Sequence, residues 1–297
     1  MTILHTSGVT QIIEGADFDG WGVAGVRDRY PIHFDNCQDM KGTVVAKNTI
    51  RNSRQRGIVL HATNNMRVEA NVAFNVTGHC FALESGLEQG NVFQGNLGVY
   101  NQAAHRLMPQ VGVSGKETDD TPAIFWITNP MNNFIGNVAT GSQGHGFWLQ
   151  LRETPRGPHS EDTVTEATNA QALGIFESNA VHSVTSSAIR VSGYHPWSEA
   201  RIVGLTVYLN NADSLEITDS EQVAVINGIF DKPVVIPPAG VQVRNAVTID
   251  VRGCSDEEDE AAAAAMMNAL AAANTDSHPN LDTPSAPSVF GLQEFQS

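Results

Sequence analysis

Three residues that can bind a metal ion or move a proton, Asp35, His61 and Glu84, end similar short phrases of the sequence. The phrases read "IHFD", "IVLH" and "FALE", and each contains apolar residues two positions apart. This spacing predicts short strands with one buried face and one exposed face. Aspartate, histidine and glutamate together form a plausible ligand set for a divalent cation, with positions left for water or substrate.

An internal repeat places these phrases at equivalent positions. Phrases headed by asparagine recur with a period of 23 to 25 residues, and a second apolar phrase begins ten residues after most of them. Short β-rich phrases without helical periodicity predict an all-β chain, a right-handed parallel β-helix with three strands in each coil. The asparagines are then expected to form an internal ladder at one turn. They are Asn48, Asn71, Asn96, Asn137 and Asn179, with a segment near 101–120 looped out after Asn96.

Stacking the coils about 4.8 Å apart, the spacing of neighbouring strands, predicts two outward columns of side chains. The second column is polar on every coil, and it begins with the three residues above. The first column reads His33, Val59, Ala82, Trp126, Trp148 and Arg190, and the second reads Asp35, His61, Glu84, Thr128, Gln150 and Ser192.

The first column has the residue types of a groove for a sugar polymer. The flat faces of Trp126 and Trp148 suit the apolar face of a sugar ring, and Arg190 suits a carboxylate. We therefore expect an acidic glycan to run along the helix axis. The alternative is that the segments 101–120 and 151–170 cover both tryptophans, because outward positions of any β-helix can serve packing alone.

Composition restricts the class of partner. The 297 residues carry a formal net charge of -15, which argues against a nucleic-acid partner, since phosphate-binding surfaces are basic. No apolar run is long enough to span a membrane, and the opening residues lack the pattern of a signal peptide. The expected organisation is a β-helix over residues 1–253 followed by a disordered acidic, Ala/Pro/Ser-rich tail over residues 254–297.

The residues also resemble a known family. "RYPIHF", "NTIRNSRQRGIVLHAT" and "TPAIFWITNP" are similar to the β-helical region of cell-surface hyaluronidases and hyaluronan-binding cell-migration proteins, a region shared with fibrocystin-like proteins. The resemblance implies an extracellular location and hyaluronan binding or depolymerisation. It also implies that a glycine-rich β domain normally lies upstream, so the chain is expected to begin inside the β-helix. Family members usually have histidine where Asp35 stands, and the shorter, harder aspartate favours calcium or manganese.

The leading hypothesis is a glycoside hydrolase, similar to a hyaluronidase, in which Asp35, His61 and Glu84 hold a divalent metal (Ca, Mn or Zn) that activates water. Without a metal, Glu84 is the expected acid and Asp35 the base. A glycan- or protein-binding module without catalysis is the first alternative. A polysaccharide lyase with Arg29 as base is the second. The expected substrate contacts are His33, Arg29, Trp126, Trp148 and Arg190.

Overall fold

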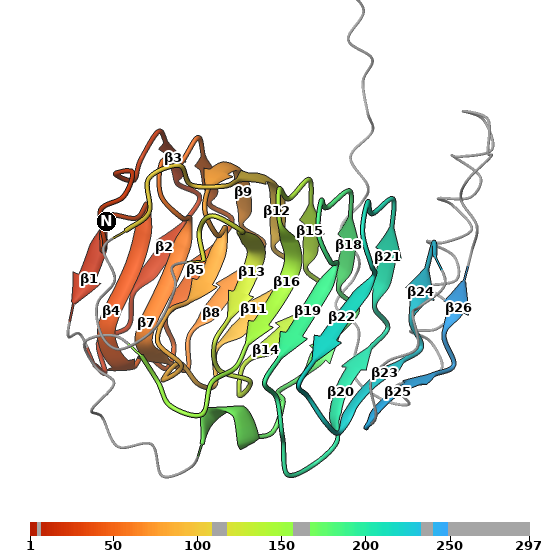
Figure 1. Ribbon diagram of the computed structural model, residues 1–297. Helices are drawn as coiled ribbons and strands as arrows, with labels where there is room; N and C mark the ends of the chain where they lie inside the picture. Colours follow the sequence, from red (N-terminus) through yellow and green to blue (C-terminus); the bar gives the residue numbers. More distant parts are fainter. Residues whose placement is uncertain (5–6, 109–117, 157–166, 233–239, 249–297) are drawn as a thin grey trace, which may run out of the picture. The chain divides into compact units, whose positions relative to one another are not determined.

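The computed structural model describes residues 1–4, 7–108, 118–156, 167–232 and 240–248. Short strands in these residues form three parallel sheets, here called A, B and C. Successive coils lie side by side along the molecule, and most coils contribute one strand to each sheet (Figure 1). The chain is therefore an all-β parallel β-helix, which confirms the fold predicted from the repeat. The predicted tail, residues 254–297, lies outside the described residues.

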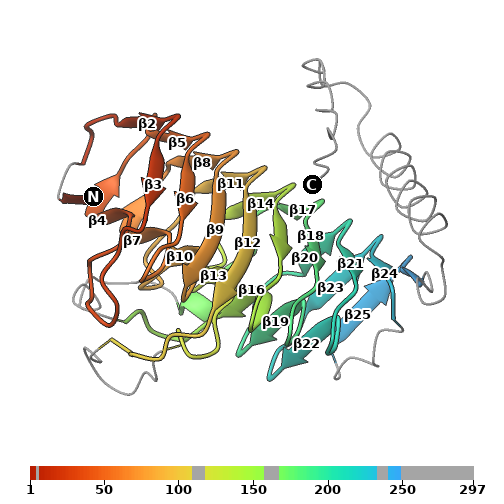
Figure 2. The same ribbon diagram turned by 90° about the horizontal axis from the view of Figure 1, so that it is seen from above.

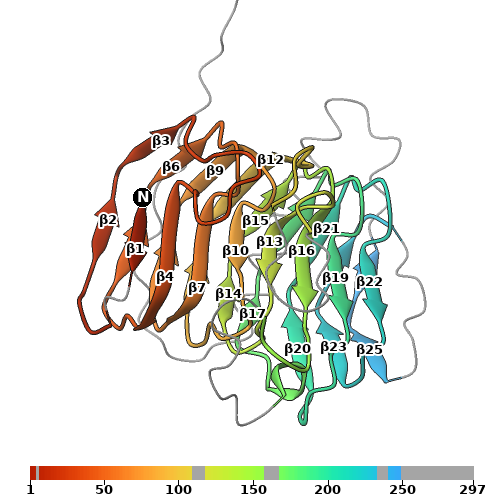
Figure 3. The same ribbon diagram turned by 60° about the vertical axis from the view of Figure 1, so that its left-hand side comes forward.

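Sheet A contains the second apolar phrase of each repeat (Figure 3). Its eight strands pair in the order in which they follow one another along the chain. They are β1 (Thr2–Leu4), β4 (Ile32–Asp39), β7 (Ile58–Asn64), β10 (Phe81–Leu83), β13 (Ala123–Ile127), β16 (His145–Gln150), β19 (Ile189–Ser192) and β22 (Leu215–Thr218).

Sheet B follows sheet A in each coil and has nine strands. Seen from above, its strands recur coil after coil at one edge of the stack (Figure 2). They are β2 (Ile12–Glu14), β5 (Val44–Ala46), β8 (Arg67–Glu69), β11 (Val92–Gln94), β14 (Asn133–Ile135), β17 (Phe176–Glu177), β20 (Ala200–Val203), β23 (Val223–Ile226) and β25 (Val241–Arg244).

Sheet C, also of nine strands, completes each coil. The described residues contain one helix, the 3-10 helix η1 (Thr168–Ala170), and no helix in them is long and apolar enough to cross a membrane. The strands of sheet C are β3 (Asp17–Asp19), β6 (Thr49–Arg51), β9 (Val72–Thr77), β12 (Leu97–Gln102), β15 (Val138–Thr140), β18 (Ala180–His182), β21 (Thr206–Tyr208), β24 (Ile229–Phe230) and β26 (Val247–Thr248).

The strand pairing in sheet A confirms the predicted register. The partner of His33 is Val59, followed in turn by Ala82, Trp126, Trp148 and Arg190. Asp35 pairs with His61 in the same way, so the two columns run along the outer face of the sheet. The residues between them point inward and are buried, because alternate side chains of a strand face opposite sides.

Stacked aromatic rings fill much of the interior. Phe125 stacks on Phe81 and Phe147, with ring centroids 4.7 Å and 4.5 Å apart. Phe134 meets Phe125 edge-on across the core from sheet B. Burial of such side chains supplies the main driving force for folding the coils.

The corner between sheets B and C has the same length in every coil. Two residues connect the strands, and the first of them adopts positive φ, as Lys47 (54°), Ala70 (49°) and Ser178 (55°) do. The second residue is the predicted ladder asparagine in five coils. Its side-chain amide bonds to the asparagine of the next coil, as Asn71 Nδ2 donates to Asn96 Oδ1 at 3.0 Å. A second, shorter ladder of Asn91 and Asn132, which the sequence analysis did not identify, lies at the corner between sheets A and B.

The two corners that border sheet A vary in length. Residues 103–122 connect β12 to β13, and residues 151–175 connect β16 to β17. The first of these matches the segment that the repeat requires to be looped out. The strands on either side of both connections still pair with their neighbours, so the stacking of the coils is unchanged.

Replacing a ladder asparagine is expected to destabilise the fold. In Asn96→Ala, the buried amide groups that Asn96 satisfies on Asn71, Val68 and Asn137 lose their partner. Because unpaired buried polar groups are costly, we expect a loss on the order of 3 kcal/mol in the free energy of unfolding, measured by urea titration. The control is Asn211→Ala, whose side chain is exposed and which should unfold close to wild type. Equal stability of the two variants would argue against the ladder as a stabilising element.

Candidate functional site

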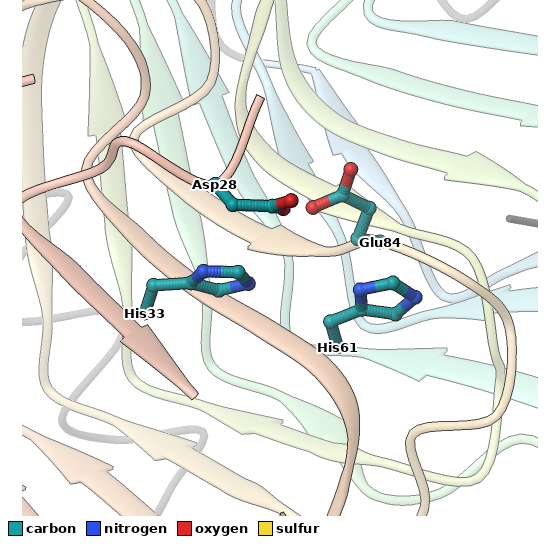
Figure 4. A group of neighbouring side chains, drawn as sticks. All are labelled: Asp28, His33, His61 and Glu84. Carbon is teal, nitrogen blue, oxygen red and sulfur yellow. The ribbon is translucent and has the colours of Figure 1, made fainter. Parts of the chain in front are cut away.

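Four side chains converge on the outer side of sheet A, near its first strands (Figure 4). We call Asp28, His33, His61 and Glu84 the carboxylate–histidine cluster. One ligand atom of each residue lies within 4.8 Å of those of the other three. The carboxylates of Asp28 and Glu84 point toward each other, and both imidazole rings lie on one side of them (Figure 4).

Local structure explains how residues far apart in the sequence meet here. His33 lies on β4 and His61 on β7, and Glu84 follows β10 directly, so adjacent coils supply all three. Asp28 comes from the connection between β3 and β4, where its φ of 62° turns the chain back over the sheet. The ring of Tyr30 packs edge-on against the imidazole of His33, with 4.9 Å between the ring centroids.

Asp35 does not belong to the group that converges. Its Oδ1 lies 3.1 Å from Nδ1 of His61, and the Asp35 side chain is 19% exposed. Of the three residues predicted as metal ligands, the structure brings His61 and Glu84 together, while Asp35 contacts His61 and is not one of the four converging residues. Asp28 and His33 occupy the remaining positions of the cluster.

Guanidinium groups surround Glu84. Its Oε1 contacts Nη1 of Arg27 and lies 3.4 Å from Nη1 of Arg56, while its Oε2 is 3.5 Å from the Tyr30 hydroxyl. Arg56 is fully buried and also binds Asp119, with Nε 3.1 Å from Oδ1. Burial disfavours the charged form of Glu84, but Arg56, His61 and Arg27 outweigh it and lower the pKa of Glu84 to about 2. Glu84 is therefore poorly suited to the role of general acid considered from the sequence.

The other members of the cluster differ in protonation. Burial lowers the pKa of His33 to about 4, so this imidazole is neutral near pH 7. Burial, together with the negative charges of Glu84 and Asp35, raises the pKa of Asp28. For His61, burial is outweighed by Asp35 and the nearby glutamates, so its pKa is raised. The cluster thus contains groups that can accept a proton beside groups that can hold one, as acid–base catalysis requires.

The two tryptophans predicted to contact a sugar ring are buried. Trp126 is 3% exposed and Trp148 is 7% exposed, and both pack with Tyr30 and Met108 in a second hydrophobic cluster on the outer face. The ring of His79 stacks on Trp126 at 4.5 Å. Neither indole offers an open face to a sugar ring, because the outward column is buried beneath neighbouring side chains. This is the covered arrangement that the sequence left open as an alternative.

The predicted arginines lie on or near this side of the molecule. Arg190 is half-buried, stacks on Trp148 at 5.0 Å and pairs with Glu216 at 3.4 Å. Arg29 is exposed in the same connection as Asp28. Two later residues of the second column, Thr128 and Gln150, line a small, partly enclosed depression. Its lining residues are Ser85, Gly86, Thr128, Gln150, Arg152, Thr154, Arg156 and Thr168.

Residues 2–189 of the chain match the family model described as CEMIP beta-helix. The chain belongs to this family. The match includes every residue of the carboxylate–histidine cluster, and it confirms the resemblance noted in the sequence.

Known proteins share the same region with this CEMIP β-helix chain. Fibrocystin-L of Mus musculus is 35% identical over 156 residues, which are 52% of this chain and 3% of the relative. Cell surface hyaluronidase CEMIP2 of Homo sapiens is 35% identical over 178 residues, 52% of this chain and 13% of the relative. A G8 domain-containing protein of Dictyostelium discoideum is 32% identical over 217 residues, which are 69% of this chain and 15% of the relative. The chain therefore spans a small part of these relatives.

Several residues of the site were missed from the sequence. Asp28 and Arg27 lie in "VRDRY", a connection outside the repeat, so no column could include them. Arg56 and Asp119 come from different connections, 63 residues apart, and meet only in the folded chain. A possible signal was that "VRDRY" places an aspartate between two arginines directly before the first strand of the site.

Removing the charge of Arg56 is expected to be strongly destabilising. Arg56→Met leaves the buried carboxylates of Glu84 and Asp119 without their shared partner. Breaking one side of a buried ion-pair network costs about 3–5 kcal/mol, which urea unfolding would measure. Arg51→Met is the matched control, because Arg51 pairs with Asp17 near the surface and should change stability little. A wild-type unfolding midpoint for Arg56→Met would contradict the network described here.

The buried imidazole of His79 is expected to make the fold sensitive to mild acid. Burial lowers its pKa to about 3, against the opposing charge of Asp119 and with Arg56 and Arg156 nearby. His79 therefore becomes protonated near pH 6.5 in the unfolded chain but stays neutral at that pH in the folded chain. Stability on this account is complete above pH 6.5 and falls by about 1.4 kcal/mol per pH unit from there toward pH 3.

Urea unfolding of wild type and His79→Gln between pH 7 and pH 5 gives the free energy of unfolding as a function of pH. The difference between the two slopes measures the contribution of His79. His105→Gln, which changes an exposed histidine, should keep the wild-type slope. If His79→Gln keeps it too, the imidazole titrates in the folded protein and the assignment is wrong.

Proposed function

We propose that the chain is an extracellular β-helix domain that binds an acidic glycosaminoglycan of the hyaluronan type and hydrolyses it at the carboxylate–histidine cluster. The observation that carries the proposal is the position of the cluster. Groups that can donate and accept protons lie beside a small depression whose lining includes Ser85, the residue after Glu84, and two arginines.

The depression supports an acidic and polar ligand. Ser85 follows Glu84 directly, and Thr128 and Gln150 continue the same column away from the cluster. Arg152 and Arg156 add positive charge along the same edge, although the chain as a whole is acidic. A glycan with regularly spaced carboxylates would meet hydroxyl, amide and guanidinium groups in sequence.

The protonation states of the cluster support hydrolysis. Cleavage of a glycosidic bond needs a proton for the leaving oxygen and an anion or base beside the anomeric carbon. Glu84 stays ionised because Arg56 and Arg27 hold its pKa low, and neutral His33 can accept a proton. The raised pKa of Asp28 marks it as the carboxyl group best able to carry one.

The name of one relative supports the substrate class and the location. CEMIP2 of Homo sapiens is named a cell surface hyaluronidase, and its identity of 35% extends over half of this chain. Hydrolysis of hyaluronan and an extracellular place are carried over from that name to this chain as part of the proposal.

Burial of the site favours a binding module as the second candidate. Three of the four cluster residues are at most 4% exposed, and only Asp28 is half-buried. A polymer therefore reaches the cluster through the Asp28 side, or it binds along the depression without being cut.

Incubation of the full chain with size-defined hyaluronan tests the proposal. We expect shorter chains with saturated ends, and we expect Asp28→Asn to lower kcat/KM on the order of 100-fold or more while the fold is kept. Asp213→Asn changes an exposed carboxylate elsewhere and should cleave like wild type. Unsaturated ends would identify a lyase. Intact polymer that still co-migrates with the protein would identify a binding module, and either result overturns hydrolysis.

A further inference from the structure

We propose that Asp28, His33, His61 and Glu84 form a binding site for one divalent transition-metal cation, with Asp35 as the outer carboxylate that holds His61. This ligand set differs from the Asp35, His61 and Glu84 set expected from the sequence, because it draws on both columns and on the connection before β4.

The geometry of the cluster suits a metal ion. Four potential ligand atoms lie within 4.8 Å of one another. Around a tetrahedral ion with bonds of about 2.1 Å, ligand atoms are separated by roughly 3.4 Å. Small side-chain rotations would bring the four atoms to that spacing. Three of them come from adjacent coils, whose positions the ladder and the strand pairing hold in place.

His33 gives the second, independent indication. Its side chain is 0% exposed, and neither ring nitrogen has a hydrogen-bond partner among the described residues. Buried polar atoms without partners are rare in folded proteins, and a bound ion is one of their established explanations. The ring is directed at the carboxylates of Asp28 and Glu84 (Figure 4). A cation between them would supply the missing partner.

Asp35 stands where metal sites commonly have an outer carboxylate. A histidine ligand usually engages a carboxylate through its other ring nitrogen, which sets the orientation and the tautomer of the ring. Nδ1 of His61 is 3.1 Å from Oδ1 of Asp35, so this carboxylate is placed to hold the ring in its orientation beside the cluster. The aspartate at position 35 therefore supports the site without binding the ion.

Charge also favours a divalent cation. Ion pairs link the cluster to Asp35, Arg27, Arg56 and Asp119. Together with Asp28 and Glu84, these residues comprise four carboxylates and two guanidinium groups. Counted with both imidazoles neutral, as metal ligands are, these six residues carry two more negative than positive charges, a sign that favours a cation. Both guanidinium groups approach Oε1 of Glu84, and the Tyr30 hydroxyl lies 3.5 Å from Oε2.

The ligand types favour zinc or a similar ion over calcium. Two imidazoles with two carboxylates are typical of first-row transition metals, whereas calcium prefers oxygen ligands in larger numbers. Burial of three of the four ligands admits an ion more readily than a larger molecule. The inference concerns the cluster for which hydrolysis is proposed, but the ion can be measured without glycan, so either proposal can fail alone.

Titration of the untagged, metal-stripped full chain with zinc chloride in a calorimeter tests the site, with elemental analysis for stoichiometry. We expect one Zn²⁺ per chain, and calcium chloride should bind at least tenfold more weakly. His33→Gln and Asp28→Asn should each weaken zinc binding at least tenfold. Asp35→Asn should weaken it about 10- to 100-fold, as outer carboxylates do. The control is His145→Gln, another buried histidine of sheet A, which should bind like wild type.

Each variant is compared only after circular dichroism shows a wild-type fold, and Asp28→Asn, in a half-buried connection, provides a test if His33→Gln does not fold. Folded wild-type protein that binds no zinc with one-to-one stoichiometry would overturn the proposal. So would wild-type affinity in both His33→Gln and Asp28→Asn. If Asp35→Asn abolished zinc binding and Asp28→Asn bound zinc like wild type, the ligands would be Asp35, His61 and Glu84. That result would also contradict the proposal.

Discussion

Everything in this molecule depends on keeping equivalent residues of successive coils in line. The two-residue corner between sheets B and C does this, because its first residue turns the chain and its second bonds to the coil above. Each asparagine amide satisfies backbone and side-chain groups of its neighbours at once, so a shift by one residue would leave several buried groups unpaired. Without that constraint His33, His61 and Glu84 would not meet.

The positive charges around the site offset its carboxylates only in part. Arg27 and Arg56 offset Glu84, and Arg56 is shared with Asp119, yet Asp28 and Asp35 add further negative charge. The unusual protonation of the cluster follows from this imbalance together with burial. The proposed acid–base chemistry and the proposed cation binding both draw on the same local excess of negative charge.

Much of the architecture could be predicted from the sequence because it repeats. The period and the ten-residue offset were sufficient to predict the coils, the asparagine ladder, the inward residues and the partners of His33. Asp28 and Arg56 could not be predicted, since they lie in connections whose path depends on tertiary packing. The burial of Trp126 was equally hidden, because an outward position says nothing about the chain that later folds over it.

The unequal corners divide the molecule into a part that must stay constant and a part that can change. A residue inserted between sheets B and C would displace every later coil relative to the earlier ones. Extra chain in a connection at either edge of sheet A, as between β12 and β13 or between β16 and β17, leaves the pairing of its strands intact. A chain built in this way can acquire a different cover, and with it a different ligand, while the frame that aligns His33 and His61 is inherited unchanged.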